Sequence, residues 1–176
     1  FISLHTYYPT NFGLSTTPYS WGSATDYTNM QNSIAKEIRV WLPTQVIFIG
    51  DSITQGWEGE GKEVWARYYA HRQAINLGIG GDRTQHVLWR LDHGNLDGLN
   101  PKAAVVMIGT NNSNGDDNTA TEIADGIKAI VSKLREKTPE TKVLVLAVFP
   151  RGDKPNPQRD KINEVNKQVA EWEVVD

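Results

Sequence analysis

The sequence predicts an α/β fold, a three-layer, doubly wound parallel sheet with helices on both faces. Short apolar runs that suit buried strands alternate with longer stretches whose apolar residues recur at helical spacing. Three of these runs end in glycine followed by small or amide residues. Strands that alternate with helices favour parallel strands joined by crossover helices. A chain of 176 residues is also long enough to bury one independent core.

Each element follows from a local pattern. Apolar runs predict four strands, at residues 45–49, 74–77, 103–108 and 142–149. Helical spacing predicts a lead-in helix that ends before Pro43, and further helices at residues 64–71, 84–92, 119–137 and around 162–172.

Two of these helices carry finer predictions. The helix at 119–137 opens with the capping box Thr119-x-x-Glu122 and closes with basic residues before a proline. In the helix at 84–92, Asp82 or Thr84 is the expected cap. There, Trp89 is expected to face the core and Arg90 the solvent.

The chain divides into an aromatic-rich amino-terminal arm with its lead-in helix, residues 1–42, and an α/β domain, residues 43–176. Asp26 is the only Asp, Glu, Lys or Arg among residues 1–35, and half of the chain's aromatic residues lie between Phe1 and Trp41. These rings either pack on the domain or form a platform for a sugar. Packing is favoured, because buried aromatic rings mostly serve packing.

Composition narrows the classes of partner. The net charge of −3 and the lack of a basic run predict no nucleic-acid partner. No apolar run approaches the roughly 20 residues of a membrane span. The absence of cysteine excludes disulfides and thiolate metal sites, and no cofactor is expected. The chain begins with Phe1 rather than Met, so we expect that a leader or a longer amino end was removed or left out. A secreted or periplasmic location is slightly favoured over a cytoplasmic one. The oligomeric state is left open.

The candidate site lies where three strands end. Gly50-Asp51-Ser52 follows the first strand and places a serine hydroxyl at the carboxyl edge of the sheet, where open α/β sheets bind ligands. The glycine block ending at Gly81 follows the second strand, and Asn111 follows the third. A serine with N–H donors aimed at a developing oxyanion is what acyl transfer needs. Each residue is also an ordinary turn residue, so the order of the three segments carries the hypothesis.

Two other interpretations of these segments are weaker. The glycine block lacks the last glycine of a G-x-G-x-x-G nucleotide loop, because Arg83 stands there. Asp51 and Asp82 have no histidine cluster beside them, so no metal site is expected. Their expected role is to hold the two loops in place by hydrogen bonds.

Together these segments resemble the first three blocks of the SGNH (GDSL-type) hydrolases. The resemblance runs from about Val46 to Trp172 and is strongest to the branch that holds type I platelet-activating-factor acetylhydrolase catalytic subunits and bacterial carbohydrate esterases. It implies a serine esterase that removes short acyl groups, above all acetyl, from a small-molecule or saccharide ester. It also implies Ser52 as the nucleophile, with an oxyanion hole formed by the Ser52 and Gly81 N–H groups and the Asn111 amide.

One block of that family is missing. The family carries Asp-x-x-His near its carboxyl end, and none of the four histidines of this chain, His5, His71, His86 and His93, follows the last expected helix. We therefore expect the domain to be incomplete at its carboxyl end, with the catalytic Asp and His beyond Asp176. Two alternatives stay open: a catalytically inactive module that binds carbohydrate or protein, and a lipid acetylhydrolase.

Overall fold

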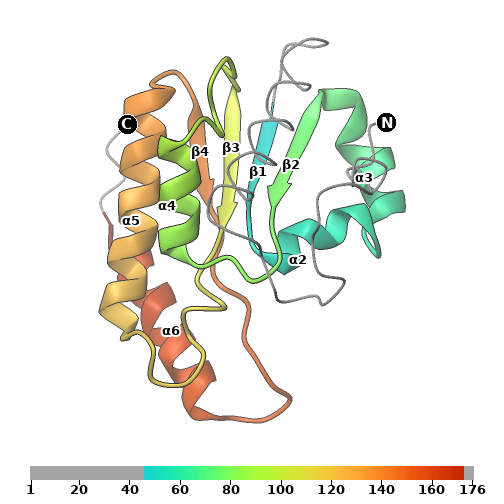
Figure 1. The fold of residues 1–176 in the computed structure, drawn as a ribbon. Coiled ribbons are helices and arrows are strands. Elements are labelled where there is room, and N and C mark those ends of the chain that lie inside the picture. Colours follow the sequence, from blue (N-terminus) through green and yellow to red (C-terminus); the bar gives the residue numbers. More distant parts are fainter. Residues whose placement is uncertain (1–45, 173–176) are drawn as a thin grey trace, which may run out of the picture.

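A four-stranded parallel sheet organises the computed structural model, which describes residues 46–172 (Figure 1). The strands are β1 (Val46–Gly50), β2 (Ala74–Gly78), β3 (Ala103–Met107) and β4 (Lys142–Val145), in the spatial order β2-β1-β3-β4. The helices are α2 (Ser52–Gln55), α3 (Lys62–Tyr68), α4 (Thr84–Asp92), α5 (Ala120–Lys137) and α6 (Pro157–Ala170), with short 3₁₀ turns at Gly56–Glu58 and Ala70–Arg72. The predicted parallel α/β fold is confirmed.

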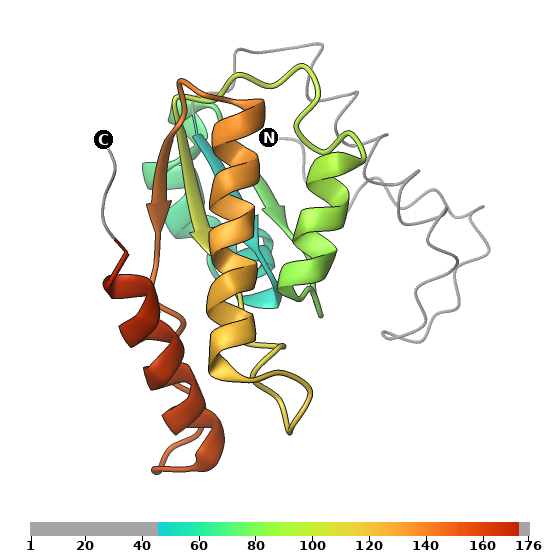
Figure 2. The ribbon, with the colours of Figure 1, turned by 90° about the vertical axis from the view of Figure 1, so that its left-hand side faces the viewer.

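Helices cover both faces of the sheet. α4, α5 and α6 lie together on one face, and α2 and α3 lie on the other (Figures 1 and 2). The main core forms between the sheet and the helices α4, α5 and α6. There, alternate residues of β1 and β3 contact the apolar faces of α4 and α5. Its fully buried members include Ile47, Ile49, Val106, Ile127 and Leu134.

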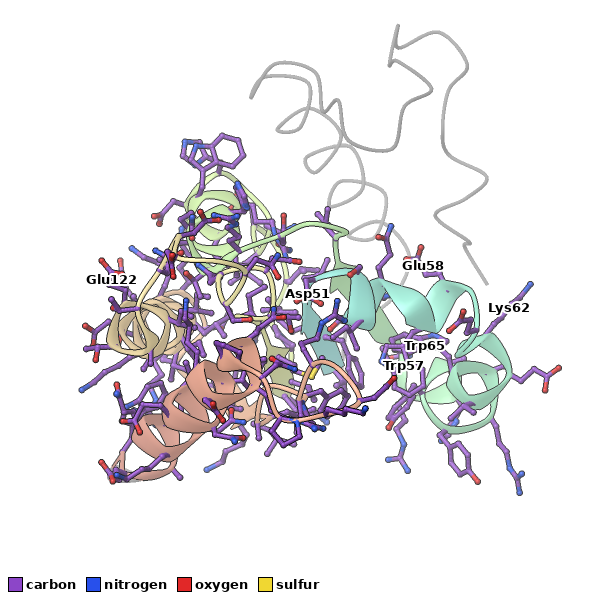
Figure 3. The ribbon with its side chains drawn as sticks, turned by 90° about the horizontal axis from the view of Figure 1, so that it is seen from below. Asp51, Trp57, Glu58, Lys62, Trp65 and Glu122 are labelled. Carbon is purple, nitrogen blue, oxygen red and sulfur yellow. The ribbon has the colours of Figure 1, made fainter. Side chains whose placement is uncertain are left out.

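The opposite face of β1 is covered by aromatic rings. Phe48 packs edge-on against Trp65 and Tyr69, with ring centroids 5.1 and 5.0 Å apart, and Trp57 completes the cluster. Figure 3 shows Trp57 and Trp65 beside each other under the α2 and α3 region. This cluster covers only part of the face. Leu144, which shares the register of Phe48 through Val105, is 55% exposed.

β4 is shorter than the predicted strand at 142–149. It ends at Val145, and the backbone of Val148 instead bonds a side chain of α6. The Val148 N–H donates to Asn166 Oδ1 at 2.8 Å, and Asn166 Nδ2 donates to the Val148 carbonyl at 2.9 Å. A side-chain amide thus takes the place of a neighbouring strand, which local sequence could not reveal.

Of the two predictions about helix starts, one is confirmed and one is wrong. Thr119 caps α5. The Thr119 N–H donates to Glu122 Oε2 and the Glu122 N–H donates to Thr119 Oγ1, as a capping box requires. The N-cap of α4 is Arg83, so the predicted cap at Asp82 or Thr84 is wrong. The lead-in helix and the arm at 1–42 lie outside the described residues. Within residues 46–172, no helix is long and apolar enough to cross a membrane.

Candidate active site

The sheet order places the candidate residues at the point where the strand order reverses. From β1 the chain passes to β2 over one face and then returns past β1 to β3 over the other face. Ligands of open α/β sheets bind outside the carboxyl ends of the strands at such a reversal. Ser52 follows β1 after one residue and Asn111 follows β3 after three, so both lie at this edge.

Ser52 is the first residue of α2 and its side chain is exposed. The turn that presents it is held by Asp51, whose Oδ1 accepts the Ile53 N–H at 2.9 Å. The N–H groups of a first helical turn have no acceptor within the helix, so the Ser52 N–H is available as a donor at this edge. Within residues 46–172 no group hydrogen-bonds the Ser52 hydroxyl.

The glycine block lies against α2. The Gly80 N–H donates to Gln55 Oε1 at 2.9 Å, and a Cβ on Gly80 would come 3.9 Å from the Ser52 Cβ. Gly81 has φ of +82°, a conformation that glycine adopts without strain, and it is exposed. Its N–H has no hydrogen-bond partner in the described part of the chain. The block therefore presents an unengaged donor next to Ser52.

The Asn111 side chain reaches the same loop. Asn111 Nδ2 donates to the Asp82 carbonyl at 2.8 Å. Because a carboxamide carries two N–H donors, this bond orients the group and leaves its second N–H for a ligand. The structure thus brings the segments of Ser52, Gly81 and Asn111 together, and these were the three residues singled out from sequence.

Arg90 connects these segments from beneath, and its predicted exposure is wrong. Its side chain is fully buried, while the Trp89 ring is partly exposed and stacks on His93. Arg90 Nε donates to Asp82 Oδ2 at 3.0 Å, and Nη2 lies 3.4 Å from the Gly50 carbonyl. Sequence held a signal for this, since Arg90 follows the buried Val87 by three positions and so shares its helix face.

Asp51 is buried as well. It is 1% exposed, and its Oδ2 and the Thr110 hydroxyl have no hydrogen-bond partner within residues 46–172. Burial raises the pKa of the Asp51 carboxyl above its ordinary value, and the Ile53 N–H offsets part of that rise. Figure 3 shows Asp51 at the centre of this edge of the molecule. Asp51 Oδ1 holds its own turn through the hydrogen bond from the Ile53 N–H.

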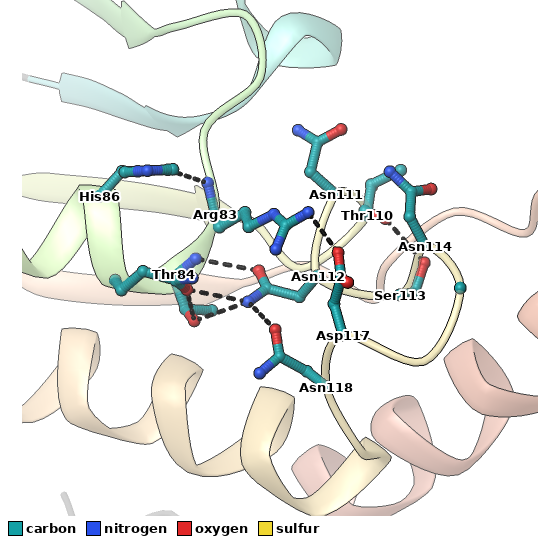
Figure 4. A network of polar contacts seen from close by, with 12 residues as sticks. Arg83, Thr84, His86, Thr110, Asn111, Asn112, Ser113, Asn114, Asp117 and Asn118 are labelled. Carbon is teal, nitrogen blue, oxygen red and sulfur yellow. Dashed lines mark hydrogen bonds and ion pairs between the residues drawn. The ribbon is translucent and has the colours of Figure 1, made fainter.

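A second network holds the loop after β3 to the start of α4 (Figure 4). Asn112 Oδ1 accepts the Thr84 N–H at 3.0 Å, so a distant side chain caps the first turn of α4. Asn112 Nδ2 also donates to Asn118 Oδ1 at 3.1 Å, and Arg83 pairs with Asp117. Sequence reasoning missed the role of Asn112, because its partner at the start of α4, Thr84, lies 28 residues away.

His71 is exposed in the 3₁₀ turn Ala70–Arg72 before β2, and the other two described histidines have partners of their own. His86 Nδ1 accepts the Arg83 N–H at 3.0 Å, and His93 lies on Trp89 with its Nδ1 2.6 Å from the Trp89 carbonyl. Neither bonds to Ser52. Among residues 46–172, no group of three or more His, Cys, Asp or Glu side chains could hold a metal ion.

Comparison with known proteins identifies the family. The sequence profile of the GDSL-like Lipase/Acylhydrolase family matches residues 48–174, which is well over half of the chain. The chain belongs to this family. The predicted resemblance is therefore confirmed, and a GDSL-type acylhydrolase domain supplies the fold described above.

Curated relatives and solved structures agree with this assignment. Platelet-activating factor acetylhydrolase IB subunit alpha2 from Homo sapiens is 47% identical over 122 residues, covering 69% of this chain and 51% of that protein. Subunit alpha1 from Homo sapiens is 46% identical over 125 residues, covering 71% and 52%. The chain thus spans about half the length of these relatives.

Among solved structures, a GDSL-like lipase from Bacteroides thetaiotaomicron has a TM-score of 0.65 at 21% identity, covering 82% of this chain and 72% of that one. An acetyl xylan esterase from Geobacillus stearothermophilus has a TM-score of 0.55 at 20% identity, covering 75% and 72%. These likenesses concern the fold.

Proposed function

We propose that this domain belongs to a serine esterase that hydrolyses short acyl esters, above all acetyl esters, through an acyl-enzyme. One observation carries the proposal. An exposed serine at the start of α2 lies beside a free Gly81 N–H and an Asn111 amide that is oriented by the Asp82 carbonyl. A nucleophile flanked by preorganised N–H donors is the arrangement that stabilises the tetrahedral intermediate of acyl transfer.

The mechanism assigns one role to each group. The Ser52 hydroxyl attacks the ester carbonyl, and the developing oxyanion accepts hydrogen bonds from the Ser52 N–H, the Gly81 N–H and the Asn111 amide. The leaving alcohol departs with a proton, and water then hydrolyses the acyl-serine.

A general base must take the Ser52 proton and return it to the alcohol. We place this base on a histidine, oriented by an aspartate, beyond Asp176, because His86 and His93 are bonded elsewhere and His71 lies in the turn before β2, at the amino end of that strand.

We favour a carbohydrate as the alcohol half of the substrate. The acetyl xylan esterase of similar fold supports a sugar ester. The acetylhydrolase relatives, at up to 47% identity, support an acetyl group and keep a lipid alcohol as the alternative. Comparing the release of acetate from acetylated xylo-oligosaccharides with its release from an acetylated ether phospholipid distinguishes the two.

Ser52→Ala tests the proposal. In the full-length gene product, the variant should lose turnover of p-nitrophenyl acetate and labelling by a fluorophosphonate probe, with an unchanged circular dichroism spectrum. Ser132→Ala is the matched control, because Ser132 is an exposed serine of α5 and should keep both properties. Wild-type turnover in Ser52→Ala would remove serine as the nucleophile.

The second candidate function is a catalytically inactive module that binds carbohydrate or protein. It is favoured by one observation, that no group within residues 46–172 hydrogen-bonds the Ser52 hydroxyl. The test uses the full-length gene product immobilised on a column. If it retains acetylated oligosaccharides but neither releases acetate nor reacts with the fluorophosphonate probe, the binding function is supported and the esterase function is excluded.

A further inference from the structure

Arg90 is the largest fully buried side chain of the described residues, and it lies below the candidate site. Its guanidinium meets three separate segments. Nε bonds Asp82 Oδ2 at 3.0 Å, Nη1 bonds Asn95 Oδ1 at 2.8 Å, and Nη2 lies 3.4 Å from the Gly50 carbonyl. One planar cation therefore joins the end of β1, the glycine loop and the turn after α4.

Two of these segments carry the proposed oxyanion donors. Gly50 lies two residues before Ser52, and Asp82 directly follows Gly81. The Gly50 carbonyl also accepts the Ile79 N–H at 3.1 Å, which brings the glycine loop to the same point. A shift of Arg90 would thus move the Ser52 and Gly81 donors relative to each other.

Asp82 extends this connection to the third donor. Its carboxylate bonds Arg90, while its backbone carbonyl accepts the Asn111 amide at 2.8 Å. Asp82 is 3% exposed, so its carboxylate cannot turn to water if the guanidinium is lost. The positions of all three donors therefore depend on one buried ion pair, between Arg90 and Asp82.

A purely stabilising role explains this pair poorly. The desolvation of two buried charges often exceeds their attraction, so a buried ion pair is weak evidence for stability. A planar guanidinium with five donors in a fixed fork is, however, well suited to hold several acceptors in one geometry.

We propose that Arg90 is a positioning residue that sets the relative placement of the three oxyanion donors. The role rests on the proposed esterase function and deepens it. Arg90 touches no substrate. Its loss should therefore slow kcat while leaving KM nearly unchanged.

Arg90→Lys is the test, because lysine keeps the charge and cannot reach three acceptors from one planar group. In the full-length gene product, kcat should fall by about 10- to 100-fold, the range expected when catalytic groups are misplaced by up to about 1 Å. KM should change by less than threefold. Both are measured with p-nitrophenyl acetate, well below the melting temperature of the variant.

Thr141→Val is the matched control. Thr141 is 6% exposed and donates to the Pro101 carbonyl at 2.6 Å, at the opposite end of the sheet. This variant should melt at a lower temperature and keep its kcat. If Arg90→Lys also keeps kcat within twofold, Arg90 is only structural and the proposal is wrong.

A second variant keeps the test usable if Arg90→Lys fails to fold. Asp82→Asn preserves the side-chain volume and weakens the same pair, so kcat should fall at least fivefold. A change within twofold would contradict the proposal. Where both variants fold, the double variant should cost no more in kcat than Arg90→Lys alone, because the two residues act as one unit. Fully additive losses in kcat would contradict the proposal that Arg90 and Asp82 act as one unit.

Ser52→Ala separates the two hypotheses. If Ser52→Ala is inactive while Arg90→Lys keeps full kcat, the positioning role fails and the esterase function stands. If Ser52→Ala turns over like the wild type, the proposed function fails, and the role of Arg90 fails with it.

Discussion

Gly78, the last residue of β2, lies against α2 with no room for a methyl group. A Cβ at this position would come 2.4 Å from the Gln55 nitrogen and 2.7 Å from the Thr54 carbonyl carbon. Both atoms belong to the backbone of α2, the helix that begins at Ser52, so neither can move aside as a flexible side chain could. Gly78→Ala should therefore push α2 away from the sheet.

The cost of this change follows from the packing. Overfilling a packed site costs about 1 to 3 kcal/mol of unfolding free energy. For a domain of this size, that corresponds to a melting temperature lower by roughly 2 to 12 °C. The displaced α2 would also shift Ser52, so esterase turnover should fall along with stability.

Gly56→Ala is the matched control, because it adds the same methyl group to open space. A Cβ on Gly56 meets no atom within 4 Å, and the residue has helical angles, φ −56° and ψ −17°. Alanine there should stabilise the protein by about 0.4 to 1 kcal/mol. Urea unfolding followed by circular dichroism measures both variants. A midpoint for Gly78→Ala at or above that of Gly56→Ala would refute the close approach of α2 and β2.

Two further predictions concern the candidate site. Asn111→Ala should lower kcat by about 10² to 10³ with little change in KM, as measured by steady-state esterase kinetics; a change in KM alone would make Asn111 a substrate-binding residue. Burial raises the pKa of Asp51 above its ordinary value of 3.8, so its contribution to stability is lost as the pH rises through the folded-state pKa. Asp51→Asn should therefore raise the urea midpoint at pH 7, and the gain should shrink as the pH falls through the folded-state pKa and vanish below pH 3.8; a gain that does not depend on pH would contradict the buried charge.

The capping residues show where local pattern suffices. The capping box of α5 was readable because Thr119 and Glu122 lie three residues apart and satisfy each other. The first turn of α4 depends on Asn112, which stands 28 residues further along the chain. No pattern within a single helix can report such a partner.

The prediction for Arg90 failed for a related reason. Charged side chains are mostly exposed, and that prior outweighed the helical spacing that placed Arg90 on the buried face with Val87. Burial became possible only because Asp82, Asn95 and the Gly50 carbonyl converge on one guanidinium. The full set of acceptors exists only in the folded chain.

The sequence by itself determined the fold class, the parallel sheet, the family and the three segments that meet at the candidate site. It could do so because strand periodicity, glycine at strand ends and the Gly-Asp-Ser order are local properties of the chain. Only the tertiary structure decided that the strand order reverses beside Ser52, that Asn111 is oriented by the Asp82 carbonyl, and that β4 gives way to a bond with Asn166. These features depend on contacts between residues distant in the chain, and such contacts form when the layers pack.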